Sequence, residues 1–361
     1  MSKFLHLACF TALLYLAASC IPLTDKPLSP TDNPDDYPWK KFEEISANLP
    51  IRGIHVTPFE VFFISNNSFF RLNNKLILQE KRLLPVDRSF FGAPILSDNV
   101  FVRVTQNASN DAVFEFNSTR NAQNMRKITA SELVDTARRE IFVPEAVYDQ
   151  TLQPGVFSAD GSKLLLVGSI NSNKIFAIVI DVQLDFTSTN FSKISVVNRV
   201  ELPGLLSKKL ESIRFINGNF YVATQNGGYR VTPTGEVKKV FSHWTLDFFA
   251  MNNILYASPY SAYDFHTSSD NGLTWRRSAP SDLKYVDVVN KRAFTKISRG
   301  VSYVNIGDSS LTKQLKVKYN PDLFTNTREA VDYHIRYFKD KYFMNDGAEV
   351  YAVDSIRTIK Q

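Results

Sequence analysis

Residues 268–275 read Ser-Ser-Asp-Asn-Gly-Leu-Thr-Trp, and this stretch decides how the rest of the chain is interpreted. The Asp270 carboxylate can accept backbone N–H bonds across a tight turn, and Gly272 can take the positive φ that such a turn needs. The hydroxyls of Ser268 and Thr274 can bond locally to the backbone. The stretch therefore predicts the turn of a β-hairpin, with the ring of its final tryptophan buried beneath the loop.

The pattern S-x-D-x-G-x-T-W resembles the Asp-box, or BNR repeat, of sialidase-like β-propellers, and it matches over eight residues. The resemblance implies a propeller fold of the type found in some bacterial lipoproteins. It also implies a structural role for the motif, because Asp-boxes lie at blade edges, away from any active centre. The residues to which it gives this role are Ser268, Asp270, Gly272, Thr274 and Trp275.

A repeated unit runs through the body of the chain, in which two apolar strands flank a turn rich in Asn, Asp or Gly. The clearest copies are Val156 to Gly168, with Asp160-Gly161 at the turn, and Ile213 to Thr224, with Asn217-Gly218. Matching stretches are Ile54 to Ser65, Pro94 to Val104 (turn Asp98-Asn99), Phe248 to Ser258 (turn Asn252-Asn253), Val286 to Ile297 (turn Asn290-Lys291) and Ile335 to Asn345 (turn Asp340-Lys341).

A second hairpin follows several of these units, around Asn73-Asn74, around Thr232 to Gly235, and around the 268–275 turn in the fifth unit. Where the units are tight they recur about every 35–40 residues, the period of four-stranded propeller blades. These features predict an all-β fold, a seven-bladed β-propeller, with six or eight blades as alternatives. A pair of β-sandwiches is the other fold considered, but it does not explain phased units with an Asp-box.

Three segments depart from the repeat. Trp39 to Leu49 is predicted to be a short helix with Phe42, Ile45 and Leu49 on one face. Thr129 to Glu132 has the form of a capping box, which predicts a short helical insert over Leu133 to Arg139. Residues 184–205 are expected to form a polar strand-and-loop insert, and such insertions often carry function.

The N-terminus is predicted to be an export signal, residues 1–19, because a basic start precedes an apolar run from Phe4 to Ala18. The run is too short for a comfortable membrane span. It ends in Leu16-Ala17-Ala18-Ser19-Cys20, which resembles the lipobox of bacterial lipoproteins, although the leucine lies four residues before the cysteine instead of three. The other cysteine, Cys9, lies inside the run, so Cys20 is the predicted lipidation site, with an ordinary signal peptide or an uncleaved anchor as alternatives.

Residues 20–38 follow as a proline-rich tether, and residues 39–361 are predicted to form the propeller domain. The resemblance to lipoproteins implies a location in the bacterial cell envelope. Because Ile21 and not Asp follows the cysteine, the enterobacterial sorting rule implies the outer membrane. The lipid is the expected contact with the membrane.

Charge and motifs exclude several classes of function. The formal charge is +6, from 42 basic and 36 acidic residues, and no dense basic tract predicts nucleic-acid binding. The five histidines do not pair at metal-ligand spacing with another His or Cys. No nucleophile elbow, phosphate loop or dinucleotide fingerprint is present. We therefore expect no metal, no cofactor and no assignable catalytic residue.

Sialidase-like hydrolysis is the alternative that the resemblance raises. That family holds the substrate carboxylate with three arginines and uses a Tyr–Glu pair and an Asp. Arg52, Arg214 and Arg336 fall on predicted inner strands facing the central channel. The three arginines lie at different distances from their predicted turns, so we expect them at different depths in the channel. Arg214 and Arg336 are also expected on opposite strand faces, so the three should not converge on one carboxylate.

Binding is the preferred interpretation. Trp244, Tyr260 and Tyr263 lie in loops around the Asp-box unit, where aromatic rings either stack on sugars or peptides or pack between blades. The sequence thus predicts an exported, lipid-anchored, non-enzymatic binding or scaffold module. A glycan or a protein is the expected partner.

Overall fold

A computed structural model of the chain describes most of one compact unit, Pro38–Ser355. The predicted signal peptide and the whole of the predicted tether, including Cys20, lie outside the described residues. The described residues are 40–45, 51–65, 67–84, 92–109, 111–121, 123–134, 140–144, 153–171, 174–185, 190–203, 210–260, 264–280, 286–289, 292–297, 300–305, 335–345 and 350–354.

The described residues form antiparallel sheets that succeed one another along the chain. The first three sheets contain β2 (Ile51–Val56), β3 (Val61–Ser65), β4 (Ser68–Leu72) and β5 (Leu78–Leu83); β6 (Ile95–Leu96), β7 (Val100–Gln106), β8 (Ala112–Ser118) and β9 (Met125–Thr129); and β10 (Phe142–Pro144), β11 (Gly155–Phe157), β12 (Lys163–Ile170), β13 (Lys174–Asp185) and β14 (Asn190–Glu201).

The remaining sheets contain β15 (Leu210–Ile216), β16 (Asn219–Thr224), β17 (Gly227–Val231) and β18 (Val237–Phe241); β19 (Thr245–Met251), β20 (Ile254–Pro259), β21 (Asp264–Ser268) and β22 (Arg276–Pro280); β23 (Val286–Val289), β24 (Arg292–Ile297) and β25 (Gly300–Asn305); and β26 (Arg336–Phe338), β27 (Lys341–Asn345) and β28 (Val350–Asp354) with β1 (Lys40–Lys41).

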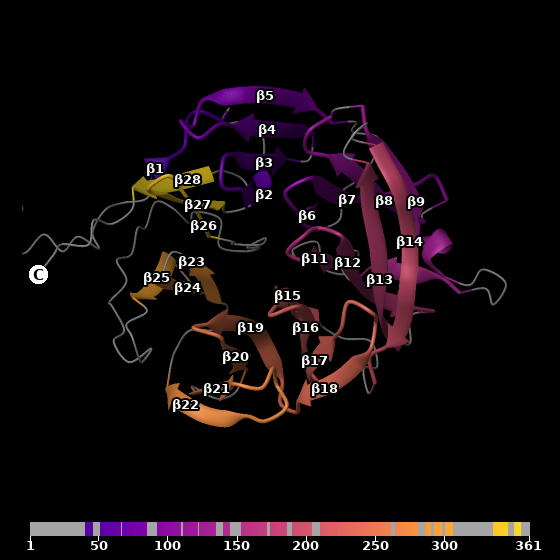
Figure 1. Cartoon of the computed structure of the whole chain (residues 1–361), viewed down its shortest axis with the longest axis vertical. Coiled ribbons are helices and arrows are strands. Elements are labelled where there is room, and N and C mark those ends of the chain that lie inside the picture. Colours follow the sequence, from indigo (N-terminus) through magenta and orange to yellow (C-terminus); the bar gives the residue numbers. More distant parts are fainter. Residues whose placement is uncertain are drawn as a thin grey trace, which may run out of the picture. The chain divides into compact units, whose positions relative to one another are not determined.

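The sheets are arranged as the blades of a β-propeller, with the first strands of successive sheets packed around a centre (Figure 1). The all-β propeller prediction is therefore confirmed. Six sheets have four or five strands in the described residues, and the remaining sheet, β23–β25, has three. The structure thus shows six complete blades, which falls short of the seven predicted and agrees with the alternative of six.

The two ends of the ring meet in one sheet, where β1 pairs with β28 (Figure 1). Lys40 lies opposite Ala352, and the Phe42 N–H donates to the Val350 carbonyl at 2.9 Å. Phe42 is buried in a cluster with residues of β2, β3 and β27. A strand from the start of the described chain therefore completes the last sheet, and the ring is closed by pairing between distant segments.

The predicted helix over Trp39 to Leu49 is wrong where the structure describes it. Residues 40–41 form strand β1, and a turn follows up to Ile45. Leu49 lies outside the described residues. Phe42 and Ile45 are both buried, but they face the gap between the first and last sheets. The open edge of β28 offers backbone partners to the segment, so tertiary pairing replaces the local helical pattern.

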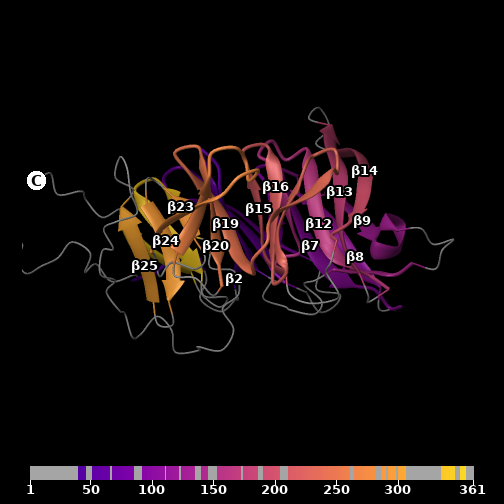
Figure 2. The same cartoon turned by 90° about the horizontal axis from the view of Figure 1, so that it is seen from below.

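The apolar core lies between neighbouring blades. Second strands such as β3 are buried at every residue, whereas outermost strands such as β5 are largely exposed. Phe69 on one sheet stacks on Phe101 of the next with ring centroids 5.4 Å apart. Strands buried on both faces need continuous apolar runs, which explains why these stretches do not alternate. Figure 2 shows neighbouring sheets lying side by side.

Turn residues set the hairpins as the sequence indicated. Asn217 and Gly218 have positive φ (47° and 77°), and so do Asn252 and Asn253 (51° and 62°). One predicted turn is misplaced by one residue. The loop between β26 and β27 is Lys339-Asp340, with φ of 46° and 62°, not Asp340-Lys341. Type I′ two-residue loops need positive φ at both positions, which glycine, asparagine and aspartate adopt more readily than other residues.

The two predicted insertions also differ in detail. The capping box is present, with the Thr129 N–H donating to the Glu132 carboxylate at 2.8 Å. It opens a short 3₁₀ helix, Ala130–Leu133, and residues 135–139 lie outside the described part of the chain. Residues 184–205 mostly prolong the hairpin of β13 and β14, which pair over most of their lengths with two register shifts.

The 268–275 turn forms the hydrogen bonds expected of Asp270 and Ser268, whereas the Thr274 hydroxyl bonds to the Asp270 side chain instead of the backbone. The Asp270 carboxylate accepts the N–H groups of Leu273 and Thr274 at 3.0 and 2.9 Å, and the Thr274 hydroxyl at 2.6 Å. These bonds hold the pKa of Asp270 well below its ordinary value, the Thr274 hydroxyl contributing most. Gly272 has φ +85°, and its N–H donates to the Ser268 hydroxyl at 2.7 Å.

Trp275 fixes this turn to the preceding blade. Its Nε1 donates to the Val240 carbonyl at 2.6 Å and to that of Gly272 at 3.1 Å. Its ring lies 5.1 Å from the Phe241 ring, centroid to centroid. The ring therefore carries both a polar contact and an apolar contact between two blades.

Replacing Trp275 by alanine should lower the free energy of unfolding by about 2–4 kcal/mol, because a large ring and its hydrogen bonds are lost between blades. Chemical denaturation monitored by circular dichroism measures this. Leu273→Ala in the same turn is the matched control, because Leu273 is 53% exposed and should change stability by about 0.5 kcal/mol or less. Equal effects of the two substitutions would contradict the structural role of the ring.

Candidate functional site

A cavity of about 270 Å³ lies among the inner strands of the propeller. Within the described residues its ionisable lining groups are His55, Arg214 and Arg336, and Gln153 and Asn345 add amides. Apolar side chains and backbone complete the wall: Gly53, Ile54, Pro94, Leu96, Val156, Phe157, Ala159, Ile213 and Phe215. The site is concave and combines hydrogen-bond donors with apolar walls, as small-ligand sites do.

Arg214 is the centre of the polar network in this channel. Its Nε and Nη2 donate to the two oxygens of Asp247 on β19, at 3.0 and 2.8 Å. Its Nη1 donates to Asp287 on β23 at 2.9 Å. The Asp287 carboxylate also accepts the N–H of Ile335, next to β26, at 3.1 Å. One guanidinium and two carboxylates therefore connect the inner strands of successive sheets.

The Asp247 side chain is 0% exposed, whereas that of Arg214 is 21% exposed. Asp247 accepts the Ser212 hydroxyl at 2.6 Å and the Phe248 N–H at 2.9 Å as well as the guanidinium. A buried carboxylate needs such a full set of donors. Because Arg214 donates on two sides to carboxylates of its own chain, it serves as a clamp between strands.

Arg336 lines the same cavity, and its Nη1 donates to the Ile335 carbonyl at 3.2 Å. The expectation that Arg214 and Arg336 face opposite sides is wrong. Arg214 pairs with Tyr221 and Arg336 with Phe343, and each pair is the third from a two-residue turn. The two arginines are therefore equivalent in register, and the one-residue error in the Lys339-Asp340 turn concealed this.

Arg52 is not among the described residues that line the cavity. It lies in a register shift between Ile51 and Gly53, where β2 departs from regular pairing with β3. Burial lowers the pKa of its guanidinium below the ordinary value. The three predicted arginines are thus divided, with two at the cavity and one elsewhere on its inner strand.

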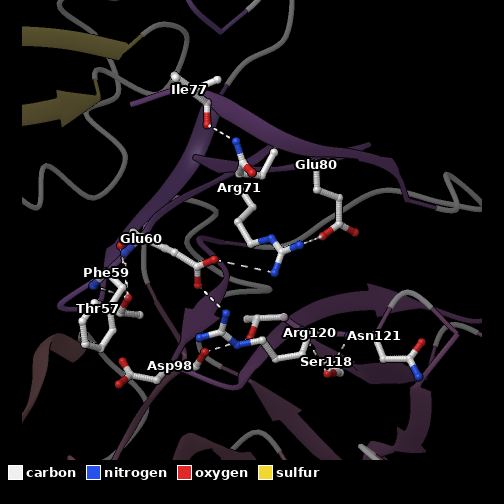
Figure 3. A network of polar contacts seen from close by, with 12 residues as sticks. Thr57, Phe59, Glu60, Arg71, Ile77, Glu80, Asp98, Ser118, Arg120 and Asn121 are labelled. Atoms are coloured by element: carbon white, nitrogen blue, oxygen red, sulfur yellow. Dashed lines mark hydrogen bonds and ion pairs between the residues drawn. The ribbon is translucent and has the colours of Figure 1, made fainter. Parts of the chain in front are cut away.

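A second polar network, which the sequence interpretation missed, joins side chains of the first two sheets (Figure 3). The Glu60 carboxylate pairs with Arg120 and lies 3.7 Å from Arg71 Nη1. His55 Nε2 lies 2.8 Å from Asp98 Oδ1, and this bond lowers the pKa of Asp98, with burial opposing the effect. These partners come from two adjacent sheets at irregular spacing, so no local pattern indicates them.

Trp244 and Tyr260 form a stacked pair, with ring centroids 3.8 Å apart and an interplanar angle of 8°. Trp244 precedes β19 and Tyr260 follows β20, so both lie at the end of this blade opposite the 252–253 and 268–275 turns. The sequence predicted them in loops around the Asp-box unit, and both flank strands of that sheet. Tyr263, the third predicted aromatic residue, lies outside the described residues.

Two further searches cover only the described part of the chain. Within it, no three His, Cys, Asp or Glu side chains are grouped as metal ligands would be. None of the helices described there is long and apolar enough to cross a membrane. The described sites therefore consist of the cavity, the two polar networks and the stacked aromatic pair.

No family model matches the chain, and no curated protein matches its sequence. Solved structures do resemble it. The extracellular domain of a putative one-component system from B. thetaiotaomicron aligns with 87% of this chain at 10% identity and a TM-score of 0.52. The Pan2 WD40 domain of Neurospora crassa covers 89% of the chain, and 96% of its own length, at 10% identity and a TM-score of 0.53.

PorZ, an essential bacterial surface component of the type-IX secretion system of Porphyromonas gingivalis, covers 88% at 8% identity with a TM-score of 0.45. The chain spans only 38–39% of the length of this protein and of the B. thetaiotaomicron domain. At these identities the likeness shows the β-propeller fold alone. Two of these structures belong to bacterial surface or extracellular proteins.

Arg214→Ala should lower the free energy of unfolding by about 3–5 kcal/mol, because it leaves the buried Asp247 carboxylate without its cation. Adding Asp247→Asn should restore part of this loss, which a double-mutant cycle in urea measures. Arg276→Ala, at an exposed position, is the matched control, with an expected change of about 0.5 kcal/mol or less. Additive single effects would show that the two side chains are not coupled.

Proposed function

We propose that this protein is a non-enzymatic binding or scaffold module of the bacterial cell envelope. The observation that carries the proposal is the clamp at Arg214, whose guanidinium bonds to both Asp247 and Asp287. A guanidinium already engaged by two carboxylates is poorly disposed to grip a substrate carboxylate. Binding of a glycan or a protein at the faces of the propeller suits such a rigid channel better than hydrolysis within it.

The cellular location of the protein is part of the proposal. The lipobox-like stretch before Cys20 and the proline-rich tether support a lipid anchor, and Ile21 supports the outer membrane. The likeness to the extracellular domain from B. thetaiotaomicron is consistent with a propeller outside the cytoplasm. The hydrogen bonds of the 268–275 turn support its assignment as an Asp-box.

We also infer that the three-stranded sheet β23–β25 is a seventh blade. Its first strand places Asp287 in the channel between Arg214 and the backbone of Ile335. Asp287 is also the third residue before its turn, pairing with Phe294, which is the register of Arg214 and Arg336 on their own inner strands. These contacts give β23 the position of an inner strand.

One observation favours the alternative, a sialidase-like hydrolase. Arg214 and Arg336 line the same cavity, and two arginines beside one space are what a bound carboxylate requires. If this alternative is right, hydrolysis of a sialoside should depend on both Arg214 and Arg336.

Cys20→Ser should release the full-length protein from membranes into the soluble fraction, because one acyl anchor is the membrane contact inferred from the sequence. Fractionation with detergent partition, together with metabolic labelling by palmitate, measures this. Lys26→Ala in the tether is the matched control and should leave partition unchanged. Membrane retention of Cys20→Ser, with no label in the wild type, would contradict the anchor.

Binding and hydrolysis can be separated with the purified Cys20→Ser variant of the full chain, which has no acyl chain that could insert into envelopes by itself. We expect no turnover of a fluorogenic sialoside, and saturable sedimentation with envelopes of the source cells. Loss of that binding after protease treatment of the envelopes would indicate a protein partner, and loss after periodate treatment a glycan. Turnover that Arg336→Ala abolishes, in a variant whose circular dichroism is unchanged, would overturn the binding proposal in favour of the hydrolase.

A further inference from the structure

Two amide side chains in the central cavity keep a carbonyl oxygen that no donor among the described residues reaches. Asn345, at the end of β27, is 1% exposed, and its Nδ2 donates to the Ile51 carbonyl at 2.9 Å. Gln153, ahead of β11, is held in the same way, because its Nε2 donates to the Pro94 carbonyl at 3.1 Å. A carbonyl partner accepts only from the NH₂ group, so these bonds also fix which way each amide points.

The Asn345 oxygen is the more informative of the two. The side chain forms no other hydrogen bond within the described residues, yet its oxygen is not sealed off from open space. Because Asn345 is almost fully buried and lines the cavity, the cavity is the space that this oxygen reaches. A buried acceptor without a donor is unfavourable, so such a group is normally paired with water or with a ligand.

The charges around the cavity offset each other. The Arg214 guanidinium is bonded to the carboxylates of Asp247 and Asp287, and Arg336 adds a second positive charge beside them. Two guanidinium groups and two carboxylates leave no net charge. An ion that entered would lose its hydration without meeting an excess of the opposite charge, so the cavity favours an uncharged ligand.

The size and the walls of the cavity narrow the class of ligand. Its volume of about 270 Å³ exceeds the ~150 Å³ that holds benzene and falls just below the range of drug-sized sites. Val156, Phe157 and Phe215 are among its apolar walls. A hexose fits this combination, because it has C–H groups for apolar walls and hydroxyl donors all around its ring.

We propose that the central cavity binds a small, uncharged polyhydroxy molecule of the size of a hexose, whose hydroxyls donate to the amide oxygens of Asn345 and Gln153. The inference goes beyond the envelope partner proposed above, which binds at the faces of the propeller. It also differs from the hydrolase alternative, in which the arginines grip a carboxylate.

The test is calorimetric titration of the Cys20→Ser variant of the full chain with glucose, galactose and mannose, each alongside its uronate and its amino sugar. We expect at least one neutral hexose to bind saturably with a Kd of about 1 mM or tighter, and its charged counterparts to bind about tenfold more weakly or worse. At least two monodeoxy forms of that hexose should bind about threefold to tenfold more weakly, because two acceptors need two hydroxyls.

Variants place the ligand in the cavity. Ala159→Phe, at an exposed position of the turn that borders the cavity, adds a ring there and should weaken binding tenfold or more. Asn74→Phe, equally exposed in the β4–β5 turn and not among the described lining residues, is the matched control and should leave affinity unchanged. Circular dichroism verifies that both variants fold. Undiminished binding by Ala159→Phe would overturn the inference.

Gln153→Met removes one acceptor at nearly constant volume and should weaken binding of the hexose about threefold to tenfold. One monodeoxy sugar, the one that lacks the hydroxyl bound by Gln153, should bind this variant and the parent equally well. A loss that is the same for every deoxy sugar would contradict the role of Gln153, since a merely structural effect would not distinguish among them.

The remaining outcomes separate this inference from the proposed function. If no neutral hexose binds up to about 50 mM, or a uronate binds more tightly than its hexose, the inference is wrong, while sedimentation with envelopes would still support a binding module. If hexose binds and the protein does not sediment with envelopes, the cavity ligand stands and the envelope partner is wrong. If neither is observed, both ideas fail.

Discussion

The bond between Arg214 and its two carboxylates is the constraint on which the rest of the ring depends. A propeller keeps its shape only while its inner strands stay in contact around the channel, and apolar packing between sheets does not fix their positions along that axis. Arg214 donates to Asp247 on β19 and Asp287 on β23 at fixed geometry. The bonded carboxylates are paired and satisfied, so the cost of burying Asp247 is offset, and loss of its cation would leave a buried charge without a partner. The clamp also contacts β23, which belongs to the sheet with the fewest described strands, β23–β25.

Outside the channel, aromatic packing between sheets supplies the cohesion. Phe69 against Phe101 joins the first two sheets, and Trp275 against Phe241 joins two later ones. Glycine has a part in this packing at one close approach, because a Cβ on Gly228 would lie 2.1 Å from the Phe248 ring. The pairing of β1 with β28 then joins the ends of the ring. Closure therefore combines one polar clamp, several ring contacts and one short stretch of strand pairing.

The sequence was sufficient for the features that depend on local chemistry. Asn217-Gly218 and the 268–275 turn could be predicted because positive φ and side-chain bonding to the backbone select particular residues. Features that depend on distant partners could not. The strand β1 looked helical because its partner edge is three hundred residues away, and the ion pair of Glu60 with Arg120 joins separate sheets without any regular spacing. The cavity arginines show that an error of one residue in a turn is enough to spoil such a prediction. Because side chains alternate between the two faces of a strand, the misplaced turn put Arg336 on the wrong face.

The two candidate regions, the channel around Arg214 and the Trp244–Tyr260 pair, differ in what their hydrogen bonds hold in place. In the channel, guanidinium and carboxylate groups bond to each other, and removing one partner leaves a buried charge that the fold must tolerate. At the Trp244–Tyr260 pair, a backbone bond and the bond from the indole to Glu211 hold two stacked rings, and Tyr260 is 52% exposed. In the first case the bonds hold the inner strands together, and in the second they order an exposed aromatic ring, which loses less entropy on contact with a partner than a mobile one would. A propeller can change such a surface without loss of stability, so specificity for a macromolecular partner is expected to reside at its loops and not at its centre.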